Sequence, residues 1–96
     1  MENQHGINYE AMDNDESYVP RHMRGGVQRY IEHGISMGGF GTALVSNNLK
    51  EAIGRADLEN KKHITSTVAW FYSYAPSKCW GSSEAVETWK GIGKTE

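Results

Sequence analysis

The residues of this chain best suited to chemistry are cations that stand beside a glycine-rich turn. Four glycines crowd residues 34–41, and Arg29 and His33 lie one helical turn apart just before them. Backbone N–H groups at the start of a helix can bind an anion, and nearby cations strengthen that binding. The sequence therefore predicts an anion site formed by Arg24, Arg29, His33, Gly38 and Gly39. The alternative is a solvated basic helix face with a close helix–helix contact at glycine.

Three further side chains are candidates for the same site. Phe40 or Trp80 could stack on the base of a nucleotide-like ligand, although a tryptophan in a small domain also serves as a core residue. Arg55 could point at the glycine turn, or it could simply pair with Glu51 one helical turn away. Both interpretations of each residue remain open from the sequence.

The sequence contains few residue patterns that are typical of catalysis or metal binding. The four histidines do not have the spacing typical of a zinc site. The glycine turn lacks the lysine and spacing of a P-loop, and no nucleophile motif is present. We therefore expect a protein that is not an enzyme, with no metal and no cofactor.

Charge divides the chain into two parts. Residues 1–17 hold five of the twelve acids and no Lys or Arg, whereas residues 18–96 hold ten bases and seven acids, or about +3. We expect residues 1–17 to be a flexible acidic arm that docks at most through Ile7, Tyr9 and Met12, and residues 18–96 to be a single helical domain. The positive charge is too small for a protein that coats DNA, so nucleic acid is an unlikely partner.

The cellular compartment is predicted from what the chain lacks. Cys79 is the only cysteine, so it cannot form an intramolecular disulfide and a reducing compartment is expected. No long apolar run or signal-peptide pattern is present. These features predict a cytoplasmic protein without membrane contact.

Capping residues divide the body into about five helices. The first should span residues 20–34, with Gly34 at its end. Residues 39–46 fit a helix or a strand, and we favour a helix because no partner strand exists. Asn48 should begin a helix whose inward residues are Leu49, Ala52, Ile53 and Ala56. Asp57 should begin a long helix over residues 58–75. Ser82 should begin a last helix, which Gly91 and Gly93 end. The expected fold class is an all-α bundle.

The long predicted helix has two apolar faces. The expected core face carries Ile64, Val68, Phe71, Tyr72 and Ala75. The second face, His63, Thr67, Trp70 and Tyr74, must meet another helix, an identical subunit or a ligand. A chain of this size buries relatively little surface by itself, so we predict a homodimer or larger with His63, Trp70 and Tyr74 at the interface.

Residues 19–89 contain a series of short segments that are typical of one family. They are Val-Pro-Arg-His-Met-Arg-Gly (19–25), Arg-Tyr-Ile-Glu-His-Gly-Ile (29–35), Gly-Gly-Phe (38–40), Ser-Asn-Asn-Leu-Lys-Glu-Ala (46–52), Gly-Arg-Ala-Asp (54–57), Tyr-Ala-Pro (74–76) and Cys-Trp-Gly-Ser (79–82). In these segments the chain resembles a family of small proteins of unassigned function from tailed bacteriophages and prophages. Similar sequences often have prolines at the positions of Ser36, Met37 and Ser83. The resemblance implies a phage accessory protein that acts inside a bacterium, and it assigns no functional residue.

These observations predict a non-enzymatic binder of a small anionic ligand, such as a linear or cyclic nucleotide immune signal that the phage would sequester in the host cytoplasm. One alternative is an inhibitor or regulator that binds a host protein through the Trp70 and Tyr74 face or through the acidic arm. Another is a weak nucleic-acid-binding regulator.

Overall fold

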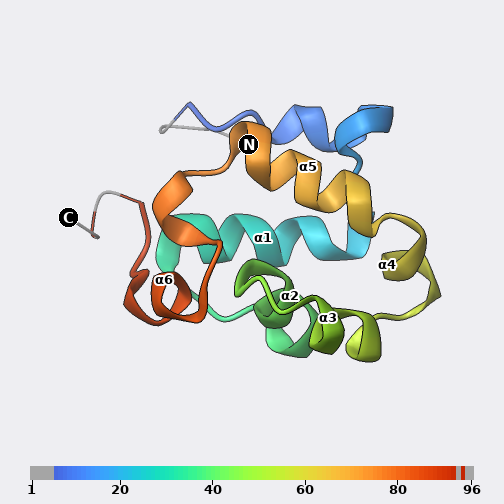
Figure 1. Ribbon diagram of the computed structural model, residues 1–96. Coiled ribbons are helices and arrows are strands. Elements are labelled where there is room, and N and C mark those ends of the chain that lie inside the picture. The colour runs from blue at the N-terminus through green and yellow to red at the C-terminus, as the bar shows by residue number, and fades with distance from the viewer. Residues whose placement is uncertain (1–5, 93, 95–96) are drawn as a thin grey trace.

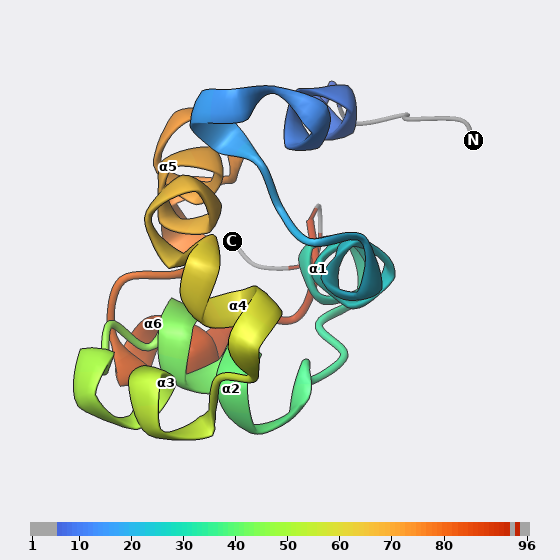
Figure 2. The ribbon, with the colours of Figure 1, turned by 90° about the vertical axis from the view of Figure 1, so that its right-hand side faces the viewer.

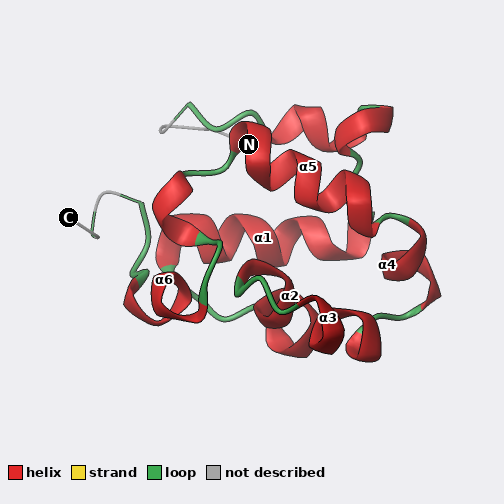
Figure 3. Ribbon diagram, in the orientation of Figure 1, coloured by secondary structure: helices red, strands yellow, loops and turns green. Residues whose placement is uncertain are grey.

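The computed structural model describes residues 6–92 and residue 94, and these form an all-α fold without a strand (Figure 3). The α-helices are α1 (Arg21–His33), α2 (Gly38–Val45), α3 (Leu49–Arg55), α4 (Leu58–Lys62), α5 (Ile64–Tyr74) and α6 (Ser83–Thr88). Three short 3-10 turns accompany them: η1 (Tyr9–Asp13), η2 (Asp15–Ser17) and η3 (Ser77–Cys79). The expectation of an all-α bundle is confirmed.

Helices α1 and α5 run in similar directions in Figure 1, and Figure 2 shows them on opposite sides of the molecule. The N-terminal segment crosses over one side of this pair, and α2, α3 and α6 lie on the other side. The core between these layers is formed by apolar side chains from nearly every element, including Met12, Val19, Val27, Ile31, Val45, Trp70 and Phe71. Burial of these side chains is the main force that holds such short helices in place.

Local capping sets several helix boundaries, as the sequence predicts. Gly34 ends α1 in a left-handed conformation with φ of 71°, which glycine adopts without a steric cost. Side-chain oxygens of Asn48, Asp57 and Ser82 accept hydrogen bonds from backbone N–H groups in the first turns of α3, α4 and α6. The choice of a helix rather than a strand for residues 39–46 is also confirmed.

The prediction of one helix over residues 58–75 is wrong, because the helix breaks at His63. This residue has φ of −118° and ψ of 21°, and it separates α4 from α5. The hydroxyls of Ser66 and Thr67 donate hydrogen bonds to the His63 carbonyl at 3.1 and 2.7 Å. The His63 carbonyl still accepts the regular bond from the Thr67 N–H at 2.9 Å, whereas the His63 N–H donates to the Asn60 carbonyl, only three residues back. The last helix also ends earlier than expected, because Trp89 is already extended; of the two glycines predicted to end it, Gly93 lies outside the described residues.

The expected inward faces of two helices are only partly right: Ala52 and Phe71 are buried as predicted, but other members of these faces are not. On α3, Ala52 is buried, but Leu49 and Ile53 are 66% and 42% exposed. On α5, the predicted core residues Val68 and Tyr72 are exposed, while Thr67 and Trp70 of the second face are buried. The second face of α5 therefore meets the protein's own chain, and Trp70 is not available for a subunit interface.

The segment that covers Trp70 is residues 7–17, which the sequence assigned to a flexible arm. Its residues Ile7, Ala11 and Met12 are buried in the core. Trp70 donates its Nε1–H to the Asn8 carbonyl at 3.1 Å, and the ring of Tyr9 stacks on the indole. The prediction of a flexible arm is therefore corrected for these residues, because their apolar side chains complete the core. Residues 1–5 of the arm lie outside the described residues.

Candidate functional site

The end of α1 is crossed by the backbone that follows α6, and this crossing positions one wall of the candidate site. The Ile92 N–H and the Trp89 Nε1–H donate to the carbonyls of Ile31 and Tyr30 at 2.8 and 2.9 Å. Carbonyls in the last turn of a helix need such outside partners. The bonds fix the backbone on both sides of Lys90.

Two glycines permit this close crossing. A Cβ atom at Gly34 would lie 2.8 Å from the backbone of Lys90. A Cβ atom at Gly91, where φ is 110°, would lie 2.5 Å from the Glu32 carbonyl oxygen. Any other residue at either position would push the two segments apart. Gly34 and Gly91 therefore determine where Lys90 stands.

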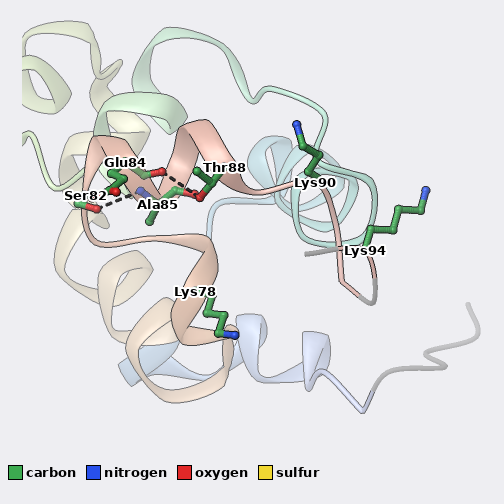
Figure 4. Close-up of a pocket in the computed structure, with 7 residues that line it drawn as sticks. All are labelled: Lys78, Ser82, Glu84, Ala85, Thr88, Lys90 and Lys94. Atoms are coloured by element: carbon green, nitrogen blue, oxygen red, sulfur yellow. Dashed lines mark hydrogen bonds between the residues drawn. The ribbon is translucent and has the colours of Figure 1, made fainter. Parts of the chain in front are cut away.

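Next to this crossing is a hollow of about 540 Å³, which we call the lysine groove. Its lining consists of Lys78, Ser82, Glu84, Ala85, Thr88, Lys90 and Lys94. Three lysines and one glutamate leave a formal charge of +2 around it. Figure 4 shows Lys78 on η3 and both Lys90 and Lys94 on the segment that follows α6, with the three side chains pointing in different directions rather than meeting at one point.

The polar groups in the wall of the lysine groove are held by α6. Ser82 accepts a hydrogen bond from the Ala85 N–H at 3.1 Å, and Thr88 donates to the Glu84 carbonyl at 3.0 Å (Figure 4). The η3 turn that carries Lys78 is tied to α1 because the Tyr30 hydroxyl donates to the Cys79 carbonyl at 2.6 Å. The lysines are thus exposed side chains on a frame that backbone and side-chain hydrogen bonds hold in place. Such ammonium groups bind phosphate or carboxylate as point charges.

The predicted glycine turn lines a different hollow, which we call the α2 groove. It measures about 460 Å³ and is lined by Gly38, Gly39, Thr42, Ala43, Ser46, Asn48, Glu51, Arg55 and Ser83. Arg55 lies against Gly39, with Nη1 3.0 Å from the place a Cβ would take. The Arg55 Nε also donates to Glu51 at 2.9 Å, so one positive and one negative charge cancel here. The α2 groove is open but formally neutral.

Arg24 does not join the predicted anion site. Its guanidinium donates to the Val19 carbonyl at 2.7 Å, to the Met12 carbonyl at 3.0 Å and to the Asp13 carboxylate at 2.8 Å. It also lies over the ring of Tyr18. These contacts fasten the N-terminal segment to α1, so Arg24 has a structural role.

The remaining predicted ligand residues are scattered. Arg29 and His33 are exposed on α1, with the Arg29 guanidinium folded back over Gly25, and neither lines the α2 groove. Phe40 is buried in the core and cannot stack on a ligand. Trp80 is half-buried against Phe71 and lines a small apolar cleft.

The three residues predicted for a subunit interface also pack within the chain. Besides the buried Trp70, the Tyr74 ring lies 6.2 Å from the indole of Trp70. The His63 ring lies 4.5 Å from that of Tyr18, and its Nε2 is 3.5 Å from a Glu59 carboxylate oxygen. Intramolecular contacts therefore explain the second face of α5.

Sequence reasoning missed the lysine groove. Its three lysines lie at positions 78, 90 and 94, so no short motif links them. The only indication in the sequence is the excess of basic residues after residue 17, and this excess does not indicate which lysines lie close together in the fold. The structure places them around one hollow because the segment after α6 crosses the end of α1.

Cys79 is the one thiol of the chain, and it is fully buried. Burial raises its pKa to about 12, because the thiolate would lose its hydration. Burial likewise raises the pKa of the Tyr30 hydroxyl. A thiol in this state is a poor nucleophile.

Within the described residues, no three His, Cys, Asp or Glu side chains are grouped so that they could hold a metal ion. None of the helices formed by these residues has the length and apolar character needed to cross a membrane. No protein-family model, curated protein or solved structure matches the chain. The resemblance to phage proteins therefore stays a prediction.

Proposed function

We propose that this protein is a non-catalytic binder of a small, multiply charged anion, and that the ligand is held in the lysine groove. The observation that carries the proposal is the formal charge of +2 around one hollow of about 540 Å³. A cleft lined by one sign of charge attracts ligands of the opposite sign and raises their local concentration. Phosphate groups of a nucleotide have the required charge.

The lysine groove supports this function better than the predicted α2 groove. In the α2 groove the Arg55 charge is already paired with Glu51. In the lysine groove the three ammonium groups outnumber the single carboxylate of Glu84. The wide spacing of the lysines around the rim favours a ligand with two or more phosphates over a single phosphate.

A binding role is supported by the chemistry of the surrounding groups. Lysines and hydroxyls line the groove, and the hydroxyls of Ser82 and Thr88 already bond to the helix backbone. The nearby thiol of Cys79 is buried, with a pKa of about 12. Neither observation offers an activated nucleophile for a covalent step.

The resemblance to phage accessory proteins suggests the biological setting. We extend the proposal to the cytoplasm of a bacterial host, where a buried free thiol such as Cys79 stays reduced. There the protein would sequester a linear or cyclic nucleotide that serves as an immune signal. Tight binding without turnover is sufficient for that role.

Isothermal titration at low salt tests the proposal, with inorganic phosphate, linear nucleotides, cyclic dinucleotides and short single-stranded oligonucleotides as ligands. The triple variant Lys78→Gln/Lys90→Gln/Lys94→Gln should lose at least about tenfold in affinity, which corresponds to about 1.4 kcal/mol. The matched control Lys50→Gln/Lys61→Gln/Lys62→Gln changes the net charge equally but leaves the groove intact, so it should bind normally. Flat heats for the whole panel, or equal losses in both triple variants, would overturn the proposal.

The oligonucleotide arm separates this function from nucleic-acid binding. Contacts to a phosphate backbone release counterions, so affinity falls steeply as salt rises. If oligonucleotides bind more tightly than every small nucleotide and show that salt dependence, the groove serves a nucleic-acid-binding regulator instead.

A second candidate function is the regulation of a partner protein through the N-terminal segment. The observation that favours it is a hollow of about 330 Å³ between η2 and α5, lined by Asn14, Asp15, Glu16, Ser17, Ala69, Ser73 and Tyr74. Carboxylates beside an aromatic edge suit a basic peptide. Chemical cross-linking in bacterial lysate should then give a stoichiometric partner that Asp15→Asn/Glu16→Gln abolishes. A partner that is retained by this variant would exclude the site.

A further inference from the structure

Helix α5 is a surface helix with an unusual exposed side. Its eleven residues, Ile64–Tyr74, include no charged side chain. Val68 and Tyr72 lie one helical turn apart on this side and are 36% and 82% exposed. The exposed side of a helix in a monomeric protein normally carries charged and polar residues. This side of α5 has the composition of an interface centre, where aromatic residues are enriched and charges are rare.

A second apolar stripe runs along α3. Leu49 and Ile53 are also one helical turn apart and are 66% and 42% exposed. Between the two stripes is a small apolar cleft of about 60 Å³, which is lined mainly by Leu44, Leu49, Ala52, Ile64, Val68 and Trp80. We call the two stripes with this cleft the α3–α5 face.

The α3–α5 face carries both projecting side chains and a hollow to receive one. The cleft of about 60 Å³ exceeds the roughly 10–15 Å³ that one water needs by the same measure, so it can receive part of an apolar side chain. Leu49 projects from the same face. In a two-fold contact each copy presents the same patch to the other, so one surface must supply both the projection and the hollow.

We propose that a second copy of this chain covers the α3–α5 face in a two-fold dimer. Charge distinguishes this face from the other candidates. A two-fold contact through the acidic turn η2 would oppose carboxylates, and one through the lysine groove would oppose ammonium groups. Like charges placed opposite each other across an interface are costly. The uncharged side of α5 meets its own copy without that cost.

The proposed dimer is independent of the anion-binding proposal. The α3–α5 face and the lysine groove share no lining residue. Loss of the dimer would leave the three lysines in place within each copy. Ligand binding and self-association are therefore tested separately.

Light scattering coupled to size exclusion, from micromolar to near-millimolar concentrations of the full chain, tests the dimer. The wild-type protein should give twice the chain mass of 10.7 kDa. Val68→Glu and Tyr72→Lys each place a charge on the face and should return the mass to that of one chain, with an unchanged helical circular dichroism spectrum. Each change should weaken association by at least about tenfold.

The matched control is Ile35→Glu, since Ile35 is 50% exposed in the loop between α1 and α2 and does not line the cleft. This variant should keep the wild-type mass. A wild-type mass of one chain at the highest concentration would overturn the proposal. So would a mass above that of a dimer, or a dimer that persists in both charged variants.

Discussion

Arg24 and Lys90 are both cations held beside α1, yet the fold uses their charges differently. Arg24 makes hydrogen bonds to Val19, Met12 and Asp13, so its charge fastens the N-terminal segment to the helix. Lys90 is held through its backbone, while its side chain is exposed at the rim of the lysine groove. The Arg24 side chain is only 22% exposed and is enclosed by the segment it binds, whereas Lys90 lies at the surface. The comparison separates Arg24 with the segment it fastens, which we call the N-terminal clamp, from a basic groove at the surface.

The most severe test of the N-terminal clamp is Met12→Ala. Met12 is 1% exposed, and removing a buried methionine side chain should lower the free energy of unfolding by about 2–5 kcal/mol. Urea denaturation followed by circular dichroism measures the loss. The control Leu58→Ala changes a side chain that is 77% exposed and should stay within about 0.5 kcal/mol. Unchanged stability of Met12→Ala would show that the segment is a free arm after all.

Arg24→Gln tests the polar part of the same clamp. Hydrogen bonds to a charged group contribute about 1.5–3 kcal/mol, and the backbone oxygens of Val19 and Met12 would lose their donor. Arg29→Gln is the matched control, since Arg29 is an exposed arginine on the same helix. Thermal melts should place Arg24→Gln well below both wild type and control. Equal melting temperatures would contradict the structural role of Arg24.

Gly91→Ala tests the crossing that positions Lys90. The new Cβ would clash with the Glu32 carbonyl, and φ of 110° is strained for alanine, so we expect a loss of about 1–3 kcal/mol. Gly54→Ala is the control, because a Cβ at Gly54 meets nothing within 4 Å. Alanine is also the better helix former, so this change should add up to about 1 kcal/mol. If both variants unfold at the same urea concentration, the crossing is not tight.

Unfolding at alkaline pH tests the burial of Cys79 in the core. The pKa of Cys79 rises from 9.0, the value for a solvated thiol, to about 12 in the fold. Above pH 9 the unfolded chain therefore loses its thiol proton first, and stability falls as pH rises. Between pH 9 and 10 this thiol should cost roughly 1 kcal/mol, and urea unfolding at the two pH values measures it. Cys79→Ala should lose less stability over this interval; an identical loss would rule out the thiol as its source.

The smallest expected effect is on the stability of the lysine variant. The three groove lysines are exposed, so Lys78→Gln/Lys90→Gln/Lys94→Gln should stay within about 0.5 kcal/mol of the wild-type free energy of unfolding. Urea denaturation without ligand is the measurement. A large loss would place these lysines with Arg24, as cations that hold the fold together.

Local features of the sequence predicted most helix boundaries. Gly34, Asn48 and Ser82 are caps whose effect depends on the few residues around them. The same reasoning failed for the break at His63, where the His63 N–H donates to the Asn60 carbonyl three residues back instead of four. It failed also for the inward side of α5. Both stripes of α5 are apolar, and Phe71 of one stripe is buried together with Trp70 of the other, which the segment 7–17 covers.

The candidate site shows the same limit. The glycine turn was visible because its residues are consecutive, and the structure does open a groove there, with Arg55 beside Gly39. The cations expected to complete this site, Arg24, Arg29 and His33, do not line that groove. Lys78 and Lys90 are twelve positions apart, so no spacing rule could pair them.

The sequence alone determined the all-α class, the caps and the division of charge, because these depend on residue types and on neighbours within one or two helical turns. Tertiary structure decided which side chains of α5 are buried, that Arg24 fastens the N-terminal segment, and that Lys78, Lys90 and Lys94 line one hollow. Those outcomes depend on segments far apart in the chain, such as residues 7–17 on α5 and Gly91 on the end of α1. The energy of such contacts comes from burial and close approach, which no local pattern records.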